Sequence, residues 1–369
     1  MAPSFESASR SQSGRVARAL WRQLIRRVYP RLDGTPALEG QPFQADYPMV
    51  PYTHSRRFGW THYGVMIPDL PAPHRFFSIM SIIGTPGALA FDTDHARVDT
   101  PRRSATVVSG TAATHPAHFA GYSIERDCEI ADDGKLIRFG AEVEIQGAYP
   151  EFHVSATYAG LRLSIALHAT DKVTWFLKTP VYDHLSLLCE YDGTLEFDGE
   201  RTIVAGLCTY EYAACPSPYL LRDRPLGNAA KAPLDFFTYQ IINLAEDGLQ
   251  LLLTQIRIAG NLAVNKVYVR GLDEYNHTWR DADVSFDVAQ YREPAERTPD
   301  GRHMALPERF AWTVHDAGSE VLRIEAVADT PYTYGLGTGF VGGYRYEGIF
   351  RGRPIGGRGY IEYIDRRDQ

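Results

Sequence analysis

The chain has 369 residues, of which 44% are hydrophobic and 22% charged, and its formal net charge is −7. This length exceeds what one hydrophobic core usually serves, so two domains of comparable size are expected. The negative charge, and a body without a basic stripe interleaved with aromatic residues, exclude nucleic acid as an expected partner. The sequence contains no apolar run of the roughly twenty residues that span a membrane and no signal-peptide pattern, so a cytoplasmic protein is expected.

The first 32 residues differ from the rest, because they hold seven arginines and only one acidic residue, Glu6. Their apolar residues recur at helical spacing, at Val16, Leu20, Leu24 and Val28. This pattern predicts a basic amphipathic helix from about Gly14 to Tyr29 that ends at Pro30. Such a helix could pack across the body as a clamp, or it could lie on an anionic membrane surface through residues 14–29.

The remaining sequence is typical of β-structure, with 22 Tyr, 17 Phe and 32 Gly. Asp-Gly pairs beginning at positions 133, 192, 198, 247 and 300 predict hairpin turns. The segment 161–168 alternates apolar residues with polar or small ones, as a half-buried strand does. We therefore predict an all-β protein with an N-terminal extension (1–45) and two domains (46–205 and 206–369). The Pro/Gly-rich segment 216–233 is expected to cross between the domains or to cover a cavity.

Cofactor and metal motifs are not recognised in the sequence. Cys128, Cys189, Cys208 and Cys215 lack the spacing of a zinc site and are interpreted as reduced thiols. The glycines of segment 335–342 have the wrong spacing for a dinucleotide fingerprint. We expect no cofactor and no metal, and the sequence leaves the oligomeric state open.

The C-terminal segment 344–365 has glycines at 348, 352, 356, 357 and 359, as expected where a strand bends and closes a barrel. It resembles the end of the carotenoid hydratase and AttH-like group, with Tyr346 at the place of a usual tryptophan. Segments 56–69, 182–213 and 234–257 resemble further blocks of that group in the same order. The resemblance implies two lipocalin-like β-barrel or sandwich domains.

In that group a His-x-Trp pair and a Tyr-x-Asp pair line the cavity. The matching positions here are Tyr210 and Tyr212 around Glu211, and Phe237 with Tyr239, while the aspartate is absent. The resemblance implies that the three tyrosines polarise or orient a carbonyl, and that Phe237 belongs to the apolar wall.

Other residues are candidates beside these. Trp60, in the first matching block, is expected in the apolar wall. An acid could come from Asp235 or Glu211, but strand alternation places Glu211 on the face opposite Tyr210 and Tyr212, which makes it the weaker candidate. His62 is an alternative acid or base. A polar cluster that contains His277 and Trp279 could line a pocket mouth.

Two classes of function follow. The first is a cofactor-independent lyase or isomerase that holds a terpenoid, polyketide-like or polycyclic substrate in a β-barrel cavity and promotes cyclisation, isomerisation, hydration or dehydration. The group that the chain resembles includes hydratases and pericyclic cyclases, and the latter need shape and hydrogen bonds more than a strong acid. The alternative is a non-catalytic carrier of a hydrophobic ligand or lipid.

Overall fold

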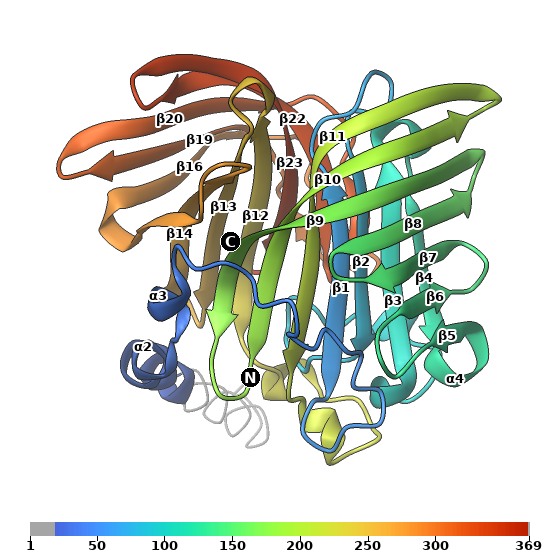
Figure 1. Ribbon diagram of the computed structural model, residues 1–369. Coiled ribbons are helices and arrows are strands. Elements are labelled where there is room, and N and C mark those ends of the chain that lie inside the picture. Colours follow the sequence, from blue (N-terminus) through green and yellow to red (C-terminus); the bar gives the residue numbers. More distant parts are fainter. Residues whose placement is uncertain (1–18, 368–369) are drawn as a thin grey trace.

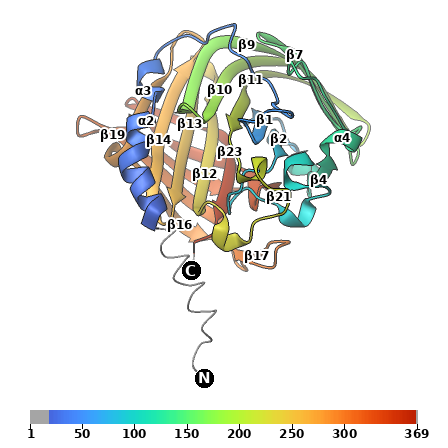
Figure 2. The same ribbon diagram turned by 90° about the horizontal axis from the view of Figure 1, so that it is seen from below.

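Two large curled antiparallel sheets form most of the protein, as the computed structural model in Figure 1 shows for residues 19–367. The first sheet, blue to green, curls into a near-barrel, and the second, olive to red, forms a half-barrel beside it (Figure 2). The predicted all-β fold is therefore confirmed.

The first sheet contains eleven strands in the order β4-β3-β2-β1-β11-β10-β9-β8-β7-β6-β5. Their bounds are β1 Trp60–Ile67, β2 Phe77–Gly84, β3 Ser104–Thr111, β4 His118–Ser123, β5 Cys128–Ile130, β6 Leu136–Phe139, β7 Val143–Ala148, β8 Glu151–Tyr158, β9 Leu161–Lys178, β10 Asp183–Phe197 and β11 Glu200–Cys215.

The second sheet contains ten strands in the order β15-β14-β13-β12-β23-β22-β20-β19-β16, with β21 paired to β22. Their bounds are β12 Leu234–Leu244, β13 Leu249–Ile258, β14 Asn261–Gly271, β15 His277–Arg280, β16 Val284–Tyr291, β19 Pro307–Asp316, β20 Ser319–Ala328, β21 Thr333–Leu336, β22 Gly339–Phe350 and β23 Arg353–Asp365. A separate two-stranded ribbon pairs β17 Glu296–Arg297 with β18 His303–Met304.

The helical elements within residues 19–367 are short, although the first two continue the helical residues 19–23 in one run. They are η1 Leu24–Val28, α2 Tyr29–Leu32, α3 Thr35–Leu38, η2 Asp94–Ala96, η3 Pro101–Arg103, η4 Ala112–Thr114, α4 Ile124–Asp127, η5 Pro218–Leu220, η6 Asn228–Ala230, η7 Ala245–Asp247 and η8 Asp281–Asp283. Within residues 19–367, no helix is long and apolar enough to cross a membrane.

The change from one sheet to the other falls in residues 216–233, the segment that the sequence marks as a crossing loop. Strand β11 runs past residue 205 and pairs along its length with β10, so it belongs to the first sheet as far as Cys215. The division of the chain into domains at residue 205 stays a prediction.

Hairpin turns explain most of the Asp-Gly pairs. The pairs that begin at 133, 198, 247 and 300 lie between consecutive strands, as predicted. The pair Asp192-Gly193 is an exception, because it lies inside β10 and pairs with both neighbouring strands. A Cβ atom at Gly193 would lie 2.2 Å from the carbonyl oxygen of Ser164 on β9, so this glycine permits close strand packing instead of a turn.

The N-terminal helix continues beyond its predicted end. Residues 19–32 are helical, and a π-helical stretch, Leu24–Val28, directly precedes α2, whose first turn contains Pro30. The predicted stop at Pro30 is therefore wrong, and the predicted residues 14–18 lie outside the described part. Figures 1 and 2 place α2 and α3 beside β14.

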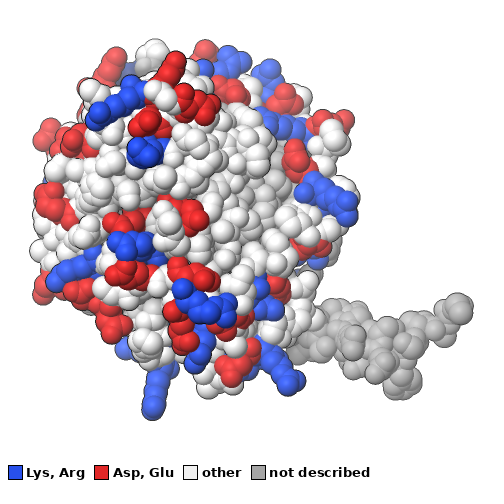
Figure 3. Space-filling model, turned by 90° about the vertical axis from the view of Figure 1, so that its right-hand side faces the viewer, with Lys and Arg blue, Asp and Glu red and all other residues white. Residues whose placement is uncertain are grey.

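Two hydrophobic cores lie on opposite faces of the wall formed by β1 and β2. One core fills the first sheet and takes Tyr63, Val65 and Ile79 from this wall. The other core fills the second sheet and the space between the sheets, and takes Met66 and Ile82. Because successive side chains of a strand alternate between faces, the wall contributes to both cores. The molecular face in Figure 3 carries basic and acidic side chains interspersed around a largely uncharged area.

Candidate active site between the two sheets

Three adjacent strands of the first sheet direct polar side chains toward the second sheet. Glu211 on β11 is opposite Gly64 of β1 in the strand register, and His62 and His184 flank it from β1 and β10. The two edge strands of this sheet, β4 and β5, are several strands away, so these groups lie in the middle of the sheet. Glu211 retains only 3% of its accessible surface and His62 only 7%.

Glu211 is the centre of this cluster. Its Oε1 accepts a hydrogen bond of 2.6 Å from the hydroxyl of Tyr239 on β12, and its Oε2 lies 3.7 Å from Nε2 of His62 and 3.8 Å from Nε2 of His184. Burial alone would raise the pKa of Glu211, but the two imidazoles lower it to about 2. The group is therefore a carboxylate at neutral pH.

A second carboxyl group, Glu362, lies on β23, and its neighbour in the strand register is Tyr239. Glu362 is buried, and its Oε1 accepts a hydrogen bond of 3.0 Å from the hydroxyl of Tyr360. Burial, and next the negative charge of Glu211, raise the pKa of Glu362 well above its usual value. Two buried carboxyl groups on facing sheets thus have pKa values shifted in opposite directions, which is a pattern of acid–base sites.

A buried arginine also joins the two sheets. Arg270 of β14 is fully buried and donates hydrogen bonds to the carbonyl oxygen and the hydroxyl of Ser186 on β10. Its guanidinium also donates to Oε1 of Gln250 on β13, at 2.8 Å. Burial lowers its pKa to about 10, so it remains a cation at neutral pH.

Aromatic rings border the cluster. The ring of Phe176 on β9 contacts His184 and Tyr239 with centroid distances of 5.0 and 5.2 Å. Tyr182 stacks on His184, and the ring of Trp60 meets Tyr182 edge-on at 5.7 Å. Because the side chain of His184 retains 21% of its accessible surface, the cluster is not fully enclosed by protein atoms.

Of the residues predicted from the sequence, the structure brings together His62, Glu211 and Tyr239, with Trp60 nearby. Tyr210 and Tyr212 are separated from them, because alternation along β11 directs both rings into the core of the first sheet. Tyr210 stacks on Phe152 at a centroid distance of 4.1 Å, and the hydroxyl of Tyr212 donates to the carbonyl oxygen of Val50. Along β11, Tyr210 and Tyr212 therefore lie on one face and Glu211 on the other, as the sequence predicts. The face that meets Tyr239 is the one that carries Glu211.

Two further predicted residues lie near the start of β12. Asp235 accepts a 2.7 Å hydrogen bond from the backbone N–H of Gly260, and its carbonyl oxygen accepts one from the N–H of Arg366. The ring of Phe237 packs edge-on against Phe91 at 5.3 Å. These contacts do not include Glu211, and the predicted roles of both residues stay predictions.

His277 and Trp279 lie on β15, at the edge of the second sheet. Nδ1 of His277 is 3.5 Å from a carboxylate oxygen of Glu39, and the indole N–H of Trp279 donates to Asp316 at 3.3 Å. Three strands separate β15 from β23, which carries Glu362. The structure does not bring this pair to the cluster.

Sequence reasoning missed four members of the site, namely Glu362, Tyr360, His184 and Arg270. A signal for Glu362 is present, because it is the only charged residue in the buried stretch Tyr360–Ile364. An ionisable residue within such an apolar strand is unusual unless it is paired or functional. His184 and Arg270 carry no comparable local signal, since their contacts come from strands far away in the sequence.

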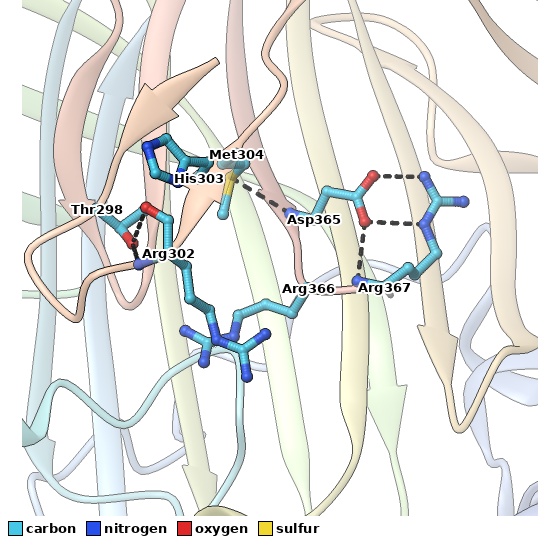
Figure 4. Close-up of a pocket in the computed structure, with 7 residues that line it drawn as sticks. All are labelled: Thr298, Arg302, His303, Met304, Asp365, Arg366 and Arg367. Carbon is cyan, nitrogen blue, oxygen red and sulfur yellow. Dashed lines mark hydrogen bonds and ion pairs between the residues drawn. The ribbon is translucent and has the colours of Figure 1, made fainter. Parts of the chain in front are cut away.

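The structure also contains a cavity of about 290 Å³ at the C-terminal end of β23 (Figure 4). Asp365 binds the guanidinium of Arg367 there, and Met304 and Arg302 come from the β17–β18 ribbon and its turn. None of the residues predicted from the sequence lines this cavity. Its polar and charged lining does not fit an apolar substrate, so the cluster around Glu211 is the better candidate site.

The fold is shared with solved structures. The chain is similar to an AttH-like protein from Nitrosomonas europaea, with 12% identity over 89% of this chain and 98% of that chain and a TM-score of 0.61. It is also similar to CghA, with 9% identity over 92% of this chain and 98% of that chain and a TM-score of 0.50. A structure of CghA with Sch210972 gives 10% identity, coverages of 90% and 97%, and a TM-score of 0.47.

At these identities the likeness shows a common fold alone, and it confirms the fold that the AttH-like resemblance implies. No match to the chain was found among curated protein sequences. A family model does match over most of the chain, residues 80–369, and its description is "Family of unknown function (DUF6670)". The chain therefore belongs to the DUF6670 family.

Proposed function

We propose that the protein is an enzyme of the lyase or isomerase type that holds a hydrophobic terpenoid, polyketide-like or polycyclic molecule between its two sheets. The reaction is a cyclisation, an isomerisation, or the addition or removal of water, and it needs no redox or nucleotide cofactor. The observation that carries this proposal is the pair of buried carboxyl groups, Glu362 and Glu211, which lie on facing sheets and whose pKa values are shifted in opposite directions.

Glu362 is suited to act as the acid. The raised pKa of Glu362 favours its neutral form, and a neutral carboxyl group can donate a proton to an alkene, or a hydrogen bond to a carbonyl oxygen that gains negative charge in the transition state. Because the hydroxyl of Tyr360 donates to Oε1 of Glu362, the acidic proton belongs on Oε2, from which it can be donated to a substrate.

Glu211 and the surrounding rings are suited to stabilise positive charge. The carboxylate is fixed by Tyr239, so it keeps its position when a cation develops nearby. The rings of Phe176 and Tyr182 add π-faces that attract cations and exclude water. An acid on one side and a fixed anion with aromatic faces on the other are the groups that protonation and rearrangement of an isoprenoid require.

A non-catalytic carrier of a hydrophobic molecule is the alternative, because lipocalin-like folds also suit the storage of a ligand. Storage gives no reason to keep two carboxyl groups buried between the sheets, since an isolated buried carboxyl group costs free energy of folding. This difference favours an enzyme.

The experiment uses the molecules that organic solvent extracts from the purified full-length protein. They are returned to fresh wild-type protein and to the Glu362→Gln variant, and the products are followed by mass spectrometry. An enzyme converts at least one of them in the wild type, and the variant converts it at least about 10²-fold more slowly. Recovery of every molecule unchanged from the wild type supports the carrier and contradicts this proposal.

We also propose that the N-terminal helix contacts an anionic membrane surface. Leu20, Leu24, Val28 and Leu32 follow one another at helical spacing, and between 41% and 66% of their surfaces are exposed. Exposed arginines at positions 22, 26, 27 and 31 flank this apolar stripe. A neighbouring stripe of the helix carries the half-buried Trp21, Ile25 and Tyr29, and the leucine stripe beside it stays exposed and free for a lipid surface.

A further inference from the structure

Three side chains known as metal ligands in proteins meet between the sheets, and each comes from a different strand. They are His62 on β1, His184 on β10 and Glu211 on β11, and one ligand atom of each lies within 4.8 Å of the others. Because the strands are hydrogen-bonded neighbours in the middle of the first sheet, their backbones hold these three positions rigidly.

The tautomer of the neutral His62 ring is set by its Nδ1 atom. Nδ1 lies 2.7 Å from the carbonyl oxygen of Ser81, which can only accept a hydrogen bond, so Nδ1 carries a hydrogen. In the neutral ring Nε2 then presents a lone pair toward Oε2 of Glu211, 3.7 Å away. Two acceptors that face one another repel unless a proton or a cation lies between them.

The other two ligands are also oriented for a shared cation. Tyr239 donates to Oε1 of Glu211 and thereby leaves Oε2 directed at the two histidines. Nε2 of His184 is buried and has no hydrogen-bond partner within the described residues. A ligating histidine that donates to a carbonyl oxygen, and a ligating carboxylate that accepts from a hydroxyl, make the outer contacts that metal sites use.

Glycine at position 64 leaves room for the ring of His62 beside Glu211. A Cβ atom there would lie 2.9 Å from Nε2 of His62, inside normal contact distance. Arg270, the buried cation of the facing sheet, is engaged with Ser186 and Gln250 and makes no hydrogen bond to Glu211 within the described residues. The position between the three ligand atoms is therefore not taken by a side chain of the described chain.

We propose that His62, His184 and Glu211 bind one divalent transition-metal ion, Zn²⁺ or Fe²⁺, through two imidazole Nε2 atoms and one carboxylate oxygen. Tetrahedral Zn²⁺ ligands lie about 3.3 Å from one another, so the observed 3.7 and 3.8 Å from Glu211 require a contraction of roughly half an ångström. The two imidazoles must also move so that their ligand nitrogens, which lie within 4.8 Å of each other, reach the same separation. Two histidines and one carboxylate leave at least one coordination position open for water or a substrate oxygen.

This inference goes beyond the proposed acid chemistry and does not depend on it. Burial is the first cause of the raised pKa of Glu362, and that cause persists when a metal neutralises Glu211. A bound ion would polarise a carbonyl or activate a water molecule beside the acid. The following test reads metal binding itself and so separates failure of this site from failure of the proposed function.

The test uses the full-length protein after removal of metals with a chelator, titrated with Co²⁺ and then with Zn²⁺. We expect each chain to bind one Co²⁺ ion and to show visible absorption bands from it. Added Zn²⁺ should displace the Co²⁺ ion and abolish these bands, and it should raise the melting temperature of the protein. Replacing His184 by Ala should weaken binding at least about 10²-fold, and the milder change Gly64→Ala should weaken it by displacing His62.

His168→Ala is the matched control, because His168 forms an exposed cluster with Glu151 and Asp192 that could bind metal adventitiously. The proposed site predicts unchanged stoichiometry and spectrum in this control. A folded wild type without the Co²⁺ bands overturns the proposal, whatever the variants do. Bands that disappear in His168→Ala and persist in His184→Ala also overturn it, because the metal would then bind at the surface.

Discussion

The hydroxyl of Tyr239, on the second sheet, donates a 2.6 Å hydrogen bond to the carboxylate of Glu211, on the first sheet. Both groups are buried, so the bond forms in surroundings where an ionised acceptor strengthens it. It joins the two sheets at the point where the ionisable groups gather. Tyr239 is therefore the predicted tyrosine that the geometry connects directly to the candidate chemistry.

Replacing Tyr239 by Phe should lower both stability and turnover. The change leaves a buried carboxylate without one of its hydrogen bonds, which costs about 1–3 kcal/mol of unfolding free energy. Turnover of a molecule that the wild type converts should fall about 10²-fold, because Glu211 loses its fixed position. Urea unfolding and a turnover assay measure the two effects.

Tyr210→Phe is the matched control on β11. The hydroxyl of Tyr210 makes no hydrogen bond within the described residues, and its ring stacks inside the first sheet. This variant should keep turnover within about twofold and stability within about 1 kcal/mol. Equal losses of turnover in the Tyr210 and Tyr239 variants would contradict the placement of the site between the sheets.

Replacing Glu362 by Gln should change the dependence of stability on pH. The pKa of Glu362 is raised in the folded state above its ordinary 4.5, so the folded state binds more protons than the unfolded state between these values. The stability from this group is complete below pH 4.5 and is lost as the pH rises through the native pKa. The wild type should lose more unfolding free energy between pH 5 and 9 than Glu362→Gln does, as measured by urea unfolding. Parallel curves for the two proteins would show that Glu362 is ionised in the folded protein.

Arg270→Met should destabilise the protein without altering the protonation of Glu362. The variant keeps most of the apolar stem but leaves Ser186 and Gln250 without the guanidinium that bridges them. Loss of these buried hydrogen bonds should cost about 2–4 kcal/mol. The midpoint of urea unfolding measures the loss, and an unchanged midpoint would mean that the guanidinium contributes nothing net to joining the sheets.

The leucine stripe should be needed for membrane binding and not for folding. Replacing Leu24 and Val28 by Ser should abolish sedimentation with phosphatidylserine-containing vesicles and leave the melting temperature unchanged, because both side chains are exposed. Ile25→Ser, on the half-buried side, is the comparison and should lower the melting temperature instead. A double variant that sediments like the wild type would favour the clamp function of this helix.

Much of the fold was predictable because short sequence patterns, such as apolar alternation, indicate strands. The buried residues Leu161, Leu163, Ile165 and Leu167 alternate along β9 as the sequence predicts. Gly359 of the last strand is needed for close packing against the neighbouring strand β22, because a Cβ atom there would lie 2.4 Å from the ring of Tyr344. Asp192-Gly193 shows where such patterns fail, because this pair predicts a turn and yet lies within the long strand β10.

The site was predictable only in part, because it forms between sheets that are distant in the sequence. Alternation separates Glu211 from Tyr210 and Tyr212, but it cannot say which face meets the second sheet. Pairing of β1 with β11 and packing of β11 against β12 decide this, and both are long-range relationships. His184 meets Glu211 through the same strand pairing, which no local motif encodes.

A measurement of the protonation state of Glu362 tests most directly the central claim that a neutral buried acid lies between the two sheets. Infrared difference spectra of the wild type and Glu362→Gln at neutral pH should show a protonated-carboxyl stretching band that only the wild type has, and Glu211→Gln should retain it. A wild type without this band, and with the signal of an ionised carboxylate lost in Glu362→Gln, would contradict the account, because the site would then hold no neutral acid.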